Sequence, residues 1–254
     1  MTDGPVLLDG VAAGMTCTGR RNNNEDSLLI QRTGDGYLLA IADGIGGHRA
    51  GEVASELATS VLSTKFRRHY LPSLSGEEIR DLLEESFISA HTSIEAEAEG
   101  EREGMGTTMV AVFIRGDMAV VANTGDSRAY HIRHGRVLSR TKDHSVVQSL
   151  IDTGQITEEE ARHHPLRAMI TNCLGNSVLV DTYVHTLLPG DIVLLSSDGF
   201  HDFVAEHRIE QPDLDDQPLD TLVPSLIRDA LECSRDNVTL IVYRHPVPVN
   251  RAFP

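Results

Sequence analysis

The sequence predicts an α+β fold, in which helices cover the faces of mostly antiparallel sheet. Short apolar stretches joined by tight turns of Gly, Asp and Asn recur along most of the chain, and this spacing is typical of antiparallel strands. Two amphipathic stretches stand together between residues 51 and 94, and a third lies near the C-terminal end. Strands and helices thus occupy separate parts of the chain, which favours the α+β class.

The strands are expected over apolar stretches flanked by turn residues. In chain order they lie at residues 15–18, 27–31, 37–42, 107–114, 118–123, 129–133, 137–140, 183–187, 192–197 and 238–243. The intervening turns indicate hairpins, including those at 33–36 and 189–191. The first ten residues and the tail after His245 lack periodicity and are expected to be loose.

Helices are expected where apolar residues recur every three or four positions. Residues 51–68 form one such stretch. A second begins at Ser75, where Glu78 three residues later completes a capping box. A last helix is expected around residues 219–232.

Residues 141–176 are the least core-like part of the chain. Two short helical segments, 145–151 and 158–163, lie there among polar residues, and Thr157 with Glu160 forms another capping box. Apolar residues remain to pack this segment, so we expect a small flap subdomain. It belongs to a single domain of residues 1–254.

Composition limits the possible functions. With 254 residues, 40% of them hydrophobic, the chain can bury a large core. It contains no apolar run of about 18 residues and no charged-then-apolar leader, so neither a membrane span nor a signal peptide is expected. The three cysteines form no CxxC pair, which fits a reducing cytoplasm and argues against disulfides or a zinc site.

The charge balance favours a hard metal ion as partner. The formal net charge is −16, and such a surface repels the phosphate backbone of nucleic acids. Clustered carboxylates also repel one another unless cations offset them. The 12 histidines show no HExxH or paired spacing, so oxygen-ligated metals are favoured over zinc.

Four apolar stretches carry acidic residues at one end. Asp43 with Gly44 ends the stretch 38–42, Glu25 and Asp26 precede 27–30, Asp198 follows 191–197, and Asp236 precedes 238–243. A carboxylate beside exposed backbone carbonyls suits a hard cation. We therefore expect one acidic metal site assembled from distant parts of the chain.

Six short motifs, in this order, give the chain a family resemblance. They are RNNNEDS at 21–27, ADGIGGH at 42–48, GMGTT at 104–108, NTGDSR at 123–128, SDG at 197–199 and DNVT at 236–239. Each alone is weak evidence, but together they resemble the metal-dependent serine/threonine protein phosphatases, the PPM or type 2C family, in its compact bacterial form. The resemblance spans nearly the whole chain.

The resemblance implies a four-layer α/β/β/α sandwich with a centre of two Mn²⁺ or Mg²⁺ ions at one edge. Asp43 would bridge both ions and the Gly44 carbonyl would bind the first, while Asp198 and Asp236 would hold the second. A hydroxide bridging the ions would attack phosphorus. Arg21 would grip the phosphate oxygens in a bidentate fork, which lysine could not match.

Other matches to the family are looser. Asp126 corresponds to the acid that, with Asp198, binds a third metal in bacterial members. Glu25 and Asp26 match an acidic pair whose direct contact with metal varies among members, and we expect Asp26 to orient metal-bound water. Ile45 stands where animal members carry a histidine proposed as general acid, so the leaving-group proton is expected from water. His48 is interpreted as a structural turn residue, and Ser145 lies near a flap position that contacts the active site in some members.

Alternatives to a protein phosphatase remain open at this point. Asp43 and Asp198 could be turn residues, Arg21 could merely offset the acids, and Asp126 is nearly as well explained as a turn residue. The protein could be a phosphatase-like module that binds phosphoproteins without turnover. It could also hydrolyse small phosphoesters, or act as a regulatory phosphatase that dephosphorylates an anti-sigma-factor antagonist. The leading hypothesis implies phosphoprotein substrates, an opposing Ser/Thr kinase and a cytoplasmic monomer.

Overall fold

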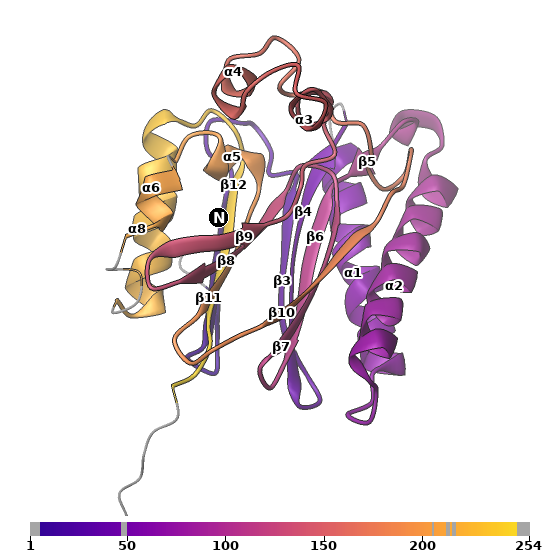
Figure 1. Ribbon diagram of the computed structural model, residues 1–254. Helices are drawn as coiled ribbons and strands as arrows, with labels where there is room; N and C mark the ends of the chain where they lie inside the picture. The colour runs from indigo at the N-terminus through magenta and orange to yellow at the C-terminus, as the bar shows by residue number, and fades with distance from the viewer. Residues whose placement is uncertain (1–5, 47–49, 205, 212–213, 215–216, 248–254) are drawn as a thin grey trace, which may run out of the picture.

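Two antiparallel sheets pack face to face in this protein, with helices on both outer faces (Figure 1). The computed structural model describes residues 6–46, 50–204, 206–211, 214 and 217–247. Residues 1–5, the last seven residues and His48, which was expected to be a turn residue, lie outside this part. The four-layer α+β sandwich expected from the sequence is confirmed.

The first sheet is built from both ends and the middle of the chain. Its order is β1 (Val6–Leu8), β2 (Ala12–Cys17), β12 (Val238–Arg244), β11 (Ile192–Ser196), β8 (Arg128–Arg133) and β9 (Arg136–Arg140). All its neighbours pair antiparallel. The pairing of Val238 with Cys17 therefore sets Asp236, just before β12, beside the end of β2, which leads to Arg21.

The second sheet carries Asp43 and Asp26 on adjacent strands. Its order is β10 (Asp181–Thr186), β7 (Met118–Thr124), β6 (Met109–Arg115), β4 (Gly36–Ile45) and β3 (Asp26–Thr33), with β5 (Gly106–Thr107) pairing the end of β4. In the antiparallel register of β3 and β4, Asp26 lies directly opposite Asp43. Directly opposed residues have Cβ atoms about 5 Å apart, so the two acids share one site.

Helices close both faces of the sandwich. The helices of the described residues, including those outside these two faces, are α1 (Ala50–His69), α2 (Gly76–Glu97), α3 (Val146–Asp152), α4 (Glu158–Arg162), α5 (Asp198–His201), α6 (Glu206–Ile209) and α8 (Leu219–Cys233), with a 3₁₀ turn η1 (Gly100–Arg102). The first two pack on the second sheet and α8 packs on the first, and a third apolar layer fills the space between the sheets. The expected capping box of Ser75 and Glu78 is present at α2.

Several expectations about strands were wrong. Residues 183–187 and 192–197 do not form a hairpin, because β10 pairs with β7 in one sheet while β11 pairs with β8 and β12 in the other. The chain likewise changes sheets between β7 and β8. The start of the chain was expected to be loose, but Val6–Leu8 pair with β2. A tight turn fixes chain direction locally, whereas the choice of sheet depends on packing between distant residues.

The flap, residues 141–176, lies above one end of the sandwich with α3 and α4 (Figure 1). Its two ends meet, because the Thr171 N–H donates to the His144 carbonyl at 2.7 Å and Val146 N–H donates to the Met169 carbonyl at 2.9 Å. Among the described helices, none is long and apolar enough to cross a membrane.

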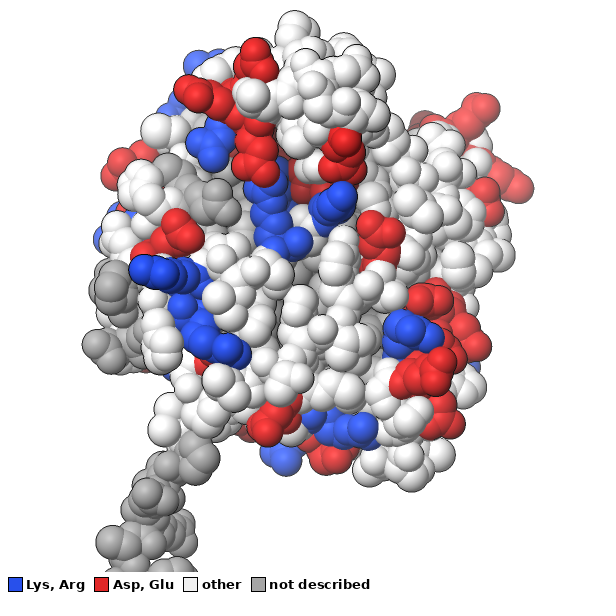
Figure 2. All heavy atoms as spheres, in the orientation of Figure 1, with Lys and Arg blue, Asp and Glu red and all other residues white. Residues whose placement is uncertain are grey.

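Figure 2 shows acidic side chains chiefly at the upper left and along the right side of this face, and basic side chains near its centre and on its lower left. Surface pairs such as Arg80 with Glu77 at 3.4 Å and Arg102 with Glu97 at 2.9 Å offset some of this charge. Exposed pairs contribute less than about 1 kcal/mol each. The apolar layers therefore account for most of the stability.

Candidate metal centre

Asp43 is fixed in place through its backbone. Its N–H donates to Thr108 Oγ1 at 3.1 Å, and its carbonyl accepts from the Thr108 N–H at 2.9 Å and from Thr107 Oγ1 at 2.8 Å. Thr108 Oγ1 also bonds Ser127 Oγ at 2.8 Å. These contacts use the backbone groups of Asp43 near the end of β4, so its side-chain carboxylate is available to bind a cation.

Asp26 links the two sheets. Its Oδ2 accepts hydrogen bonds from Ser197 Oγ at 2.9 Å and from Thr239 Oγ1 at 2.6 Å. Ser197 immediately precedes Asp198, and Thr239 lies three residues after Asp236, so a single buried carboxylate connects three acid-bearing segments. The Asp26 Oδ1 atom is buried and has no hydrogen-bond partner among the described residues.

Asp198 is the first residue of α5 rather than a turn residue between strands. The following Gly199 allows the helix to approach the other acidic segment, because a Cβ added there would lie 1.9 Å from the Asn237 carbonyl oxygen. Asp236 Oδ1 in turn accepts from the Asn237 N–H at 2.8 Å. Close backbone packing thus holds Asp198 and Asp236 together.

Arg21 reaches the same site from the loop after β2. Its Nη2 lies 2.7 Å from Asp236 Oδ2, and 56% of its side chain is exposed. The hydrogen bond to Asp236 raises the pKa of the guanidinium. Arg21 therefore stays positively charged at the rim of an acidic site, where it is accessible from solvent.

The acids are close enough to perturb one another strongly. Burial raises the pKa of Asp43 well above its ordinary value, and the charges of Asp26, Asp198, Asp126 and Asp236 raise it further. The pKa of Asp198 is raised well above its ordinary value by burial and then by Asp126 and Asp236. Five carboxylates from remote segments therefore share one region, and a cation there would relieve their repulsion.

The remaining predicted residues surround this centre. Gly44 donates its N–H to the Glu25 carbonyl at 3.0 Å, and a Cβ on Gly44 would lie 2.2 Å from the Gly51 carbonyl of α1. The pKa of Glu25 is raised, chiefly by burial. Burial and the charge of Asp143 raise the pKa of Asp126 to about 7.

Ser145 serves the flap. It is buried, and its Oγ caps α3 by accepting from the Gln148 N–H at 3.2 Å. The neighbouring His144 ties the flap to the Asp126 turn, because Gly125 donates its N–H to His144 Nδ1 at 3.3 Å. His144 also donates its own N–H to the Gly125 carbonyl at 2.9 Å.

The donor set suits a hard cation. All the acidic ligands are oxygen atoms, and the unpartnered Asp26 Oδ1 is a free acceptor beside Asp43. Over the residues that the structure describes, no three His, Cys, Asp or Glu side chains already form a coordination shell. Arg21 donates to one carboxylate oxygen of Asp236, and two hydroxyls donate to Oδ2 of Asp26. The residues fit a cation by charge and chemistry, while the assignment of individual ligands is a proposal.

Sequence reasoning missed Asp202 and the hydroxyls. Asp202 lies four residues after Asp198, one helical turn further on, and its charge raises the pKa values of both Asp198 and Asp126. The i,i+4 spacing of the two acids was a usable signal only once a helix was expected there. Ser197 and Thr239 were visible only as members of the SDG and DNVT motifs, and nothing in the sequence showed that their hydroxyls contact Asp26.

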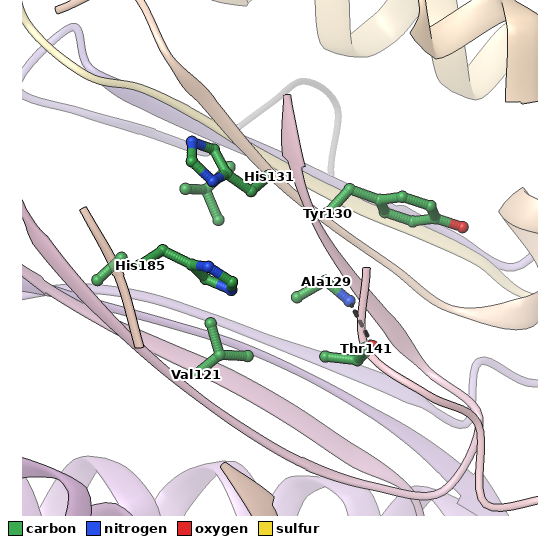
Figure 3. Close-up of a pocket in the computed structure, with 8 residues that line it drawn as sticks. Val121, Ala129, Tyr130, His131, Thr141 and His185 are labelled. Carbon is green, nitrogen blue, oxygen red and sulfur yellow. Dashed lines mark hydrogen bonds between the residues drawn. The ribbon is translucent and has the colours of Figure 1, made fainter. Parts of the chain in front are cut away.

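A second polar site lies between the sheets, away from the metal centre. His131 and His185, from opposite sheets, face each other with ring centroids 5.4 Å apart (Figure 3). The cavity between them leaves about 10 Å³, the room of a single water molecule. Burial and the neighbouring His131 lower the pKa of His185. His131 is held by Asp191 at 2.8 Å, so this group belongs to the packing of the sandwich.

Comparison with known proteins places this geometry in context. A family model described as protein phosphatase 2C matches residues 13–233. A Listeria monocytogenes protein, serine/threonine phosphatase stp, is 37% identical over 196 residues, which cover 75% of this chain and 77% of the relative. The Mycobacterium tuberculosis serine/threonine protein phosphatase PstP is 39% identical over 192 residues, covering 74% of this chain but only 36% of PstP.

Solved structures give the same result. The serine/threonine phosphatase Stp1 from Staphylococcus aureus superposes with a TM-score of 0.87 at 34% identity, over 97% of this chain and 98% of that one. The PstP catalytic domain in complex with two manganese ions gives a TM-score of 0.76 at 32% identity, over 92% of this chain and 97% of that one.

Proposed function

The chain belongs to the protein phosphatase 2C family of serine/threonine phosphatases, and we propose that it hydrolyses phosphoserine and phosphothreonine at a centre of two Mn²⁺ or Mg²⁺ ions. The observation that carries this proposal is the convergence of Asp43, Asp198 and Asp236 from three remote segments, together with the raised pKa values of the first two. Such ions, when bound, activate water and offset the charge of the phosphoryl group.

Each acid has a proposed role. Asp43, fixed by Thr107 and Thr108, would lie between the two ions, with the Gly44 carbonyl on the first. Asp198 and Asp236 would hold the second ion, and Asp126 with Asp198 would hold a third. Glu25 and Asp26 would orient water, since Asp26 Oδ1 has no hydrogen-bond donor within the described residues.

Arg21 would bind the phosphate of the substrate. Its planar guanidinium can donate two parallel hydrogen bonds to phosphate oxygens, and its exposed position at the rim allows a phosphoprotein to reach it. With Asp236 engaged by a cation, the Arg21 guanidinium would keep its charge and would be free to donate to the phosphate oxygens. Ile45 offers no proton, so the leaving seryl or threonyl oxygen would take its proton from solvent.

The biological setting follows from this chemistry. Phosphoprotein substrates require a Ser/Thr kinase to supply them, and we propose that this protein opposes one. We also propose that it acts as a monomer in the cytoplasm. Its three cysteines, Cys17, Cys173 and Cys233, are all free, as suits that reducing compartment.

A metal titration of phosphothreonine-peptide hydrolysis tests the function. Activity should vanish in EDTA and return with excess Mn²⁺, and Asp198→Asn or Asp236→Asn should abolish it. Asp81→Asn, an exposed acid on α2, removes the same charge and should leave activity unchanged. Full activity in EDTA would refute the proposal. Peptide binding without turnover would favour a binding module, and preference for small phosphoesters would favour a different hydrolase.

A further inference from the structure

The side chain of Asn237 connects two segments of the site. Its Nδ2 donates to the Thr18 carbonyl at 2.9 Å and to the Asn23 carbonyl at 2.8 Å, and its Oδ1 accepts from the Glu25 N–H at 2.8 Å. Only 6% of the residue is exposed. Both amide hydrogens and the amide oxygen are therefore used, and all three partners are backbone groups of the loop that joins β2 to β3.

That loop carries Arg21. The Arg21 N–H donates to the same Thr18 carbonyl, at 3.3 Å, and so closes a turn. Gly19 within this turn has φ +61°, and a Cβ there would lie 2.0 Å from the Asp236 carbonyl oxygen. The turn is thus packed backbone to backbone on residues 236–237. The side chain of Asn237 fixes the whole loop, at its beginning through Thr18 and at its end through Asn23 and Glu25.

The main chain of Asn237 has a different task. Its N–H donates to Asp236 Oδ1 at 2.8 Å, and its carbonyl oxygen lies against Gly199. A substitution of the side chain leaves these backbone contacts in place. The side chain therefore serves the Arg21 loop, whereas the backbone serves the acidic residues, and mutation can separate the two.

We propose that Asn237 is a positioning residue that sets Arg21 for phosphate binding, an inference that rests on the proposed function. Within the described part of the chain, the exposed Arg21 side chain forms its one hydrogen bond with Asp236, so its direction depends on the anchoring of its backbone. A displacement of about 1 Å in a positioning group can lower a rate about a hundredfold. No charge or metal ligand is altered when Asn237 is replaced by alanine.

A double-mutant cycle tests this role with a phosphothreonine peptide at saturating Mn²⁺. Asn237→Ala should lower kcat/KM at least tenfold, mainly through KM. In the Arg21→Ala background the same substitution should lower it less than twofold, because the group it positions is gone. The Mn²⁺ concentration that half-saturates thermal stabilisation should stay within twofold of wild type.

Controls separate positioning from general destabilisation. Val242→Ala also truncates a buried residue of β12 but lies away from the loop, and should leave kcat/KM unchanged. If Asn237→Ala does not fold, Asn237→Leu keeps the approximate volume and adds no charge while losing both donors and the acceptor, and should give the same coupling with Arg21→Ala.

Three results would overturn the inference. They are equal losses in both backgrounds, a tenfold weaker response to Mn²⁺, or no loss at all. Absence of turnover by the wild-type chain would instead contradict the proposed function, so the two failures are distinguishable.

Discussion

Asp26→Asn should stabilise the metal-free protein, because burial and the nearby Asp236 disfavour the charge of Asp26 when no cation is bound. Burial raises the pKa of Asp26 to about 6, against an ordinary value near 4. The folded state therefore binds the proton more tightly than the unfolded state does. Stability falls as the pH rises from about 4 through 6, and the loss reaches about 3 kcal/mol above that range.

The amide introduced by this substitution imitates the protonated acid. Its oxygen can accept from the Ser197 and Thr239 hydroxyls as the carboxylate does, and its nitrogen can donate to the adjacent Asp43 carboxylate. Allowing about 1 kcal/mol for weaker bonds to a neutral acceptor leaves a gain of about 2 kcal/mol at pH 7.5. For a chain of this size, that gain raises Tm by about 4 to 8 °C.

Urea and thermal unfolding in EDTA measure this gain. The advantage of Asp26→Asn should be present at pH 7.5 and shrink to less than about 1 kcal/mol at pH 4, where the wild-type carboxyl is protonated. Asp81→Asn, which removes an exposed charge, should change stability by less than about 0.5 kcal/mol. The reasoning would be refuted if Asp26→Asn were no more stable than wild type at pH 7.5, or if its gain in stability over wild type were the same at both pH values.

Three further predictions concern the same fold. Asp191→Asn should lower the free energy of unfolding by about 2 to 3 kcal/mol at neutral pH, because hydrogen bonds from Arg133 and His131 lower the Asp191 pKa to about 2 against the effect of burial. This contribution to stability is present above pH 4 and is lost as the pH falls through 2. An unchanged urea midpoint at pH 7 would contradict the prediction. Gly199→Ala should lower Mn²⁺ affinity at least tenfold in calorimetry, because the added Cβ would collide with the Asn237 carbonyl. An affinity equal to that of wild type would show that α5 can shift without disturbing the site. Saturating Mn²⁺ should raise Tm more at pH 7.5 than at pH 5, since the acids it neutralises are partly protonated at the lower pH, and equal shifts would count against the acidic site.

Local structure was predictable where one segment determines it. The capping boxes of Ser75 and Thr157 were legible in the sequence and are present, as are the helices that follow them. The β3–β4 hairpin was predictable because its turn residues and both strands are adjacent in the chain. The sheet assignment of β10 and β11 was not, since the strands on either side of Pro189 and Gly190 separate to opposite layers.

The candidate site shows the same division. Asp43, Asp198 and Asp236 stood out because each follows or precedes an apolar strand. The supporting contacts could not be found this way, because the Asp26 bonds to Ser197 and Thr239 join residues more than 170 positions apart. Asn237 was visible only as part of a motif, and its three backbone partners emerge from the folded loop.

Anomalous diffraction at the manganese edge, from crystals grown with Mn²⁺, tests the central claim most directly. We expect two strong peaks about 3.5 to 4 Å apart, with the proposed third ion giving a weaker peak beside Asp126 and Asp198. Asp43 should contact both, the Gly44 carbonyl the first, and Asp198 with Asp236 the second. A single peak, or manganese bound away from these residues, would contradict the account.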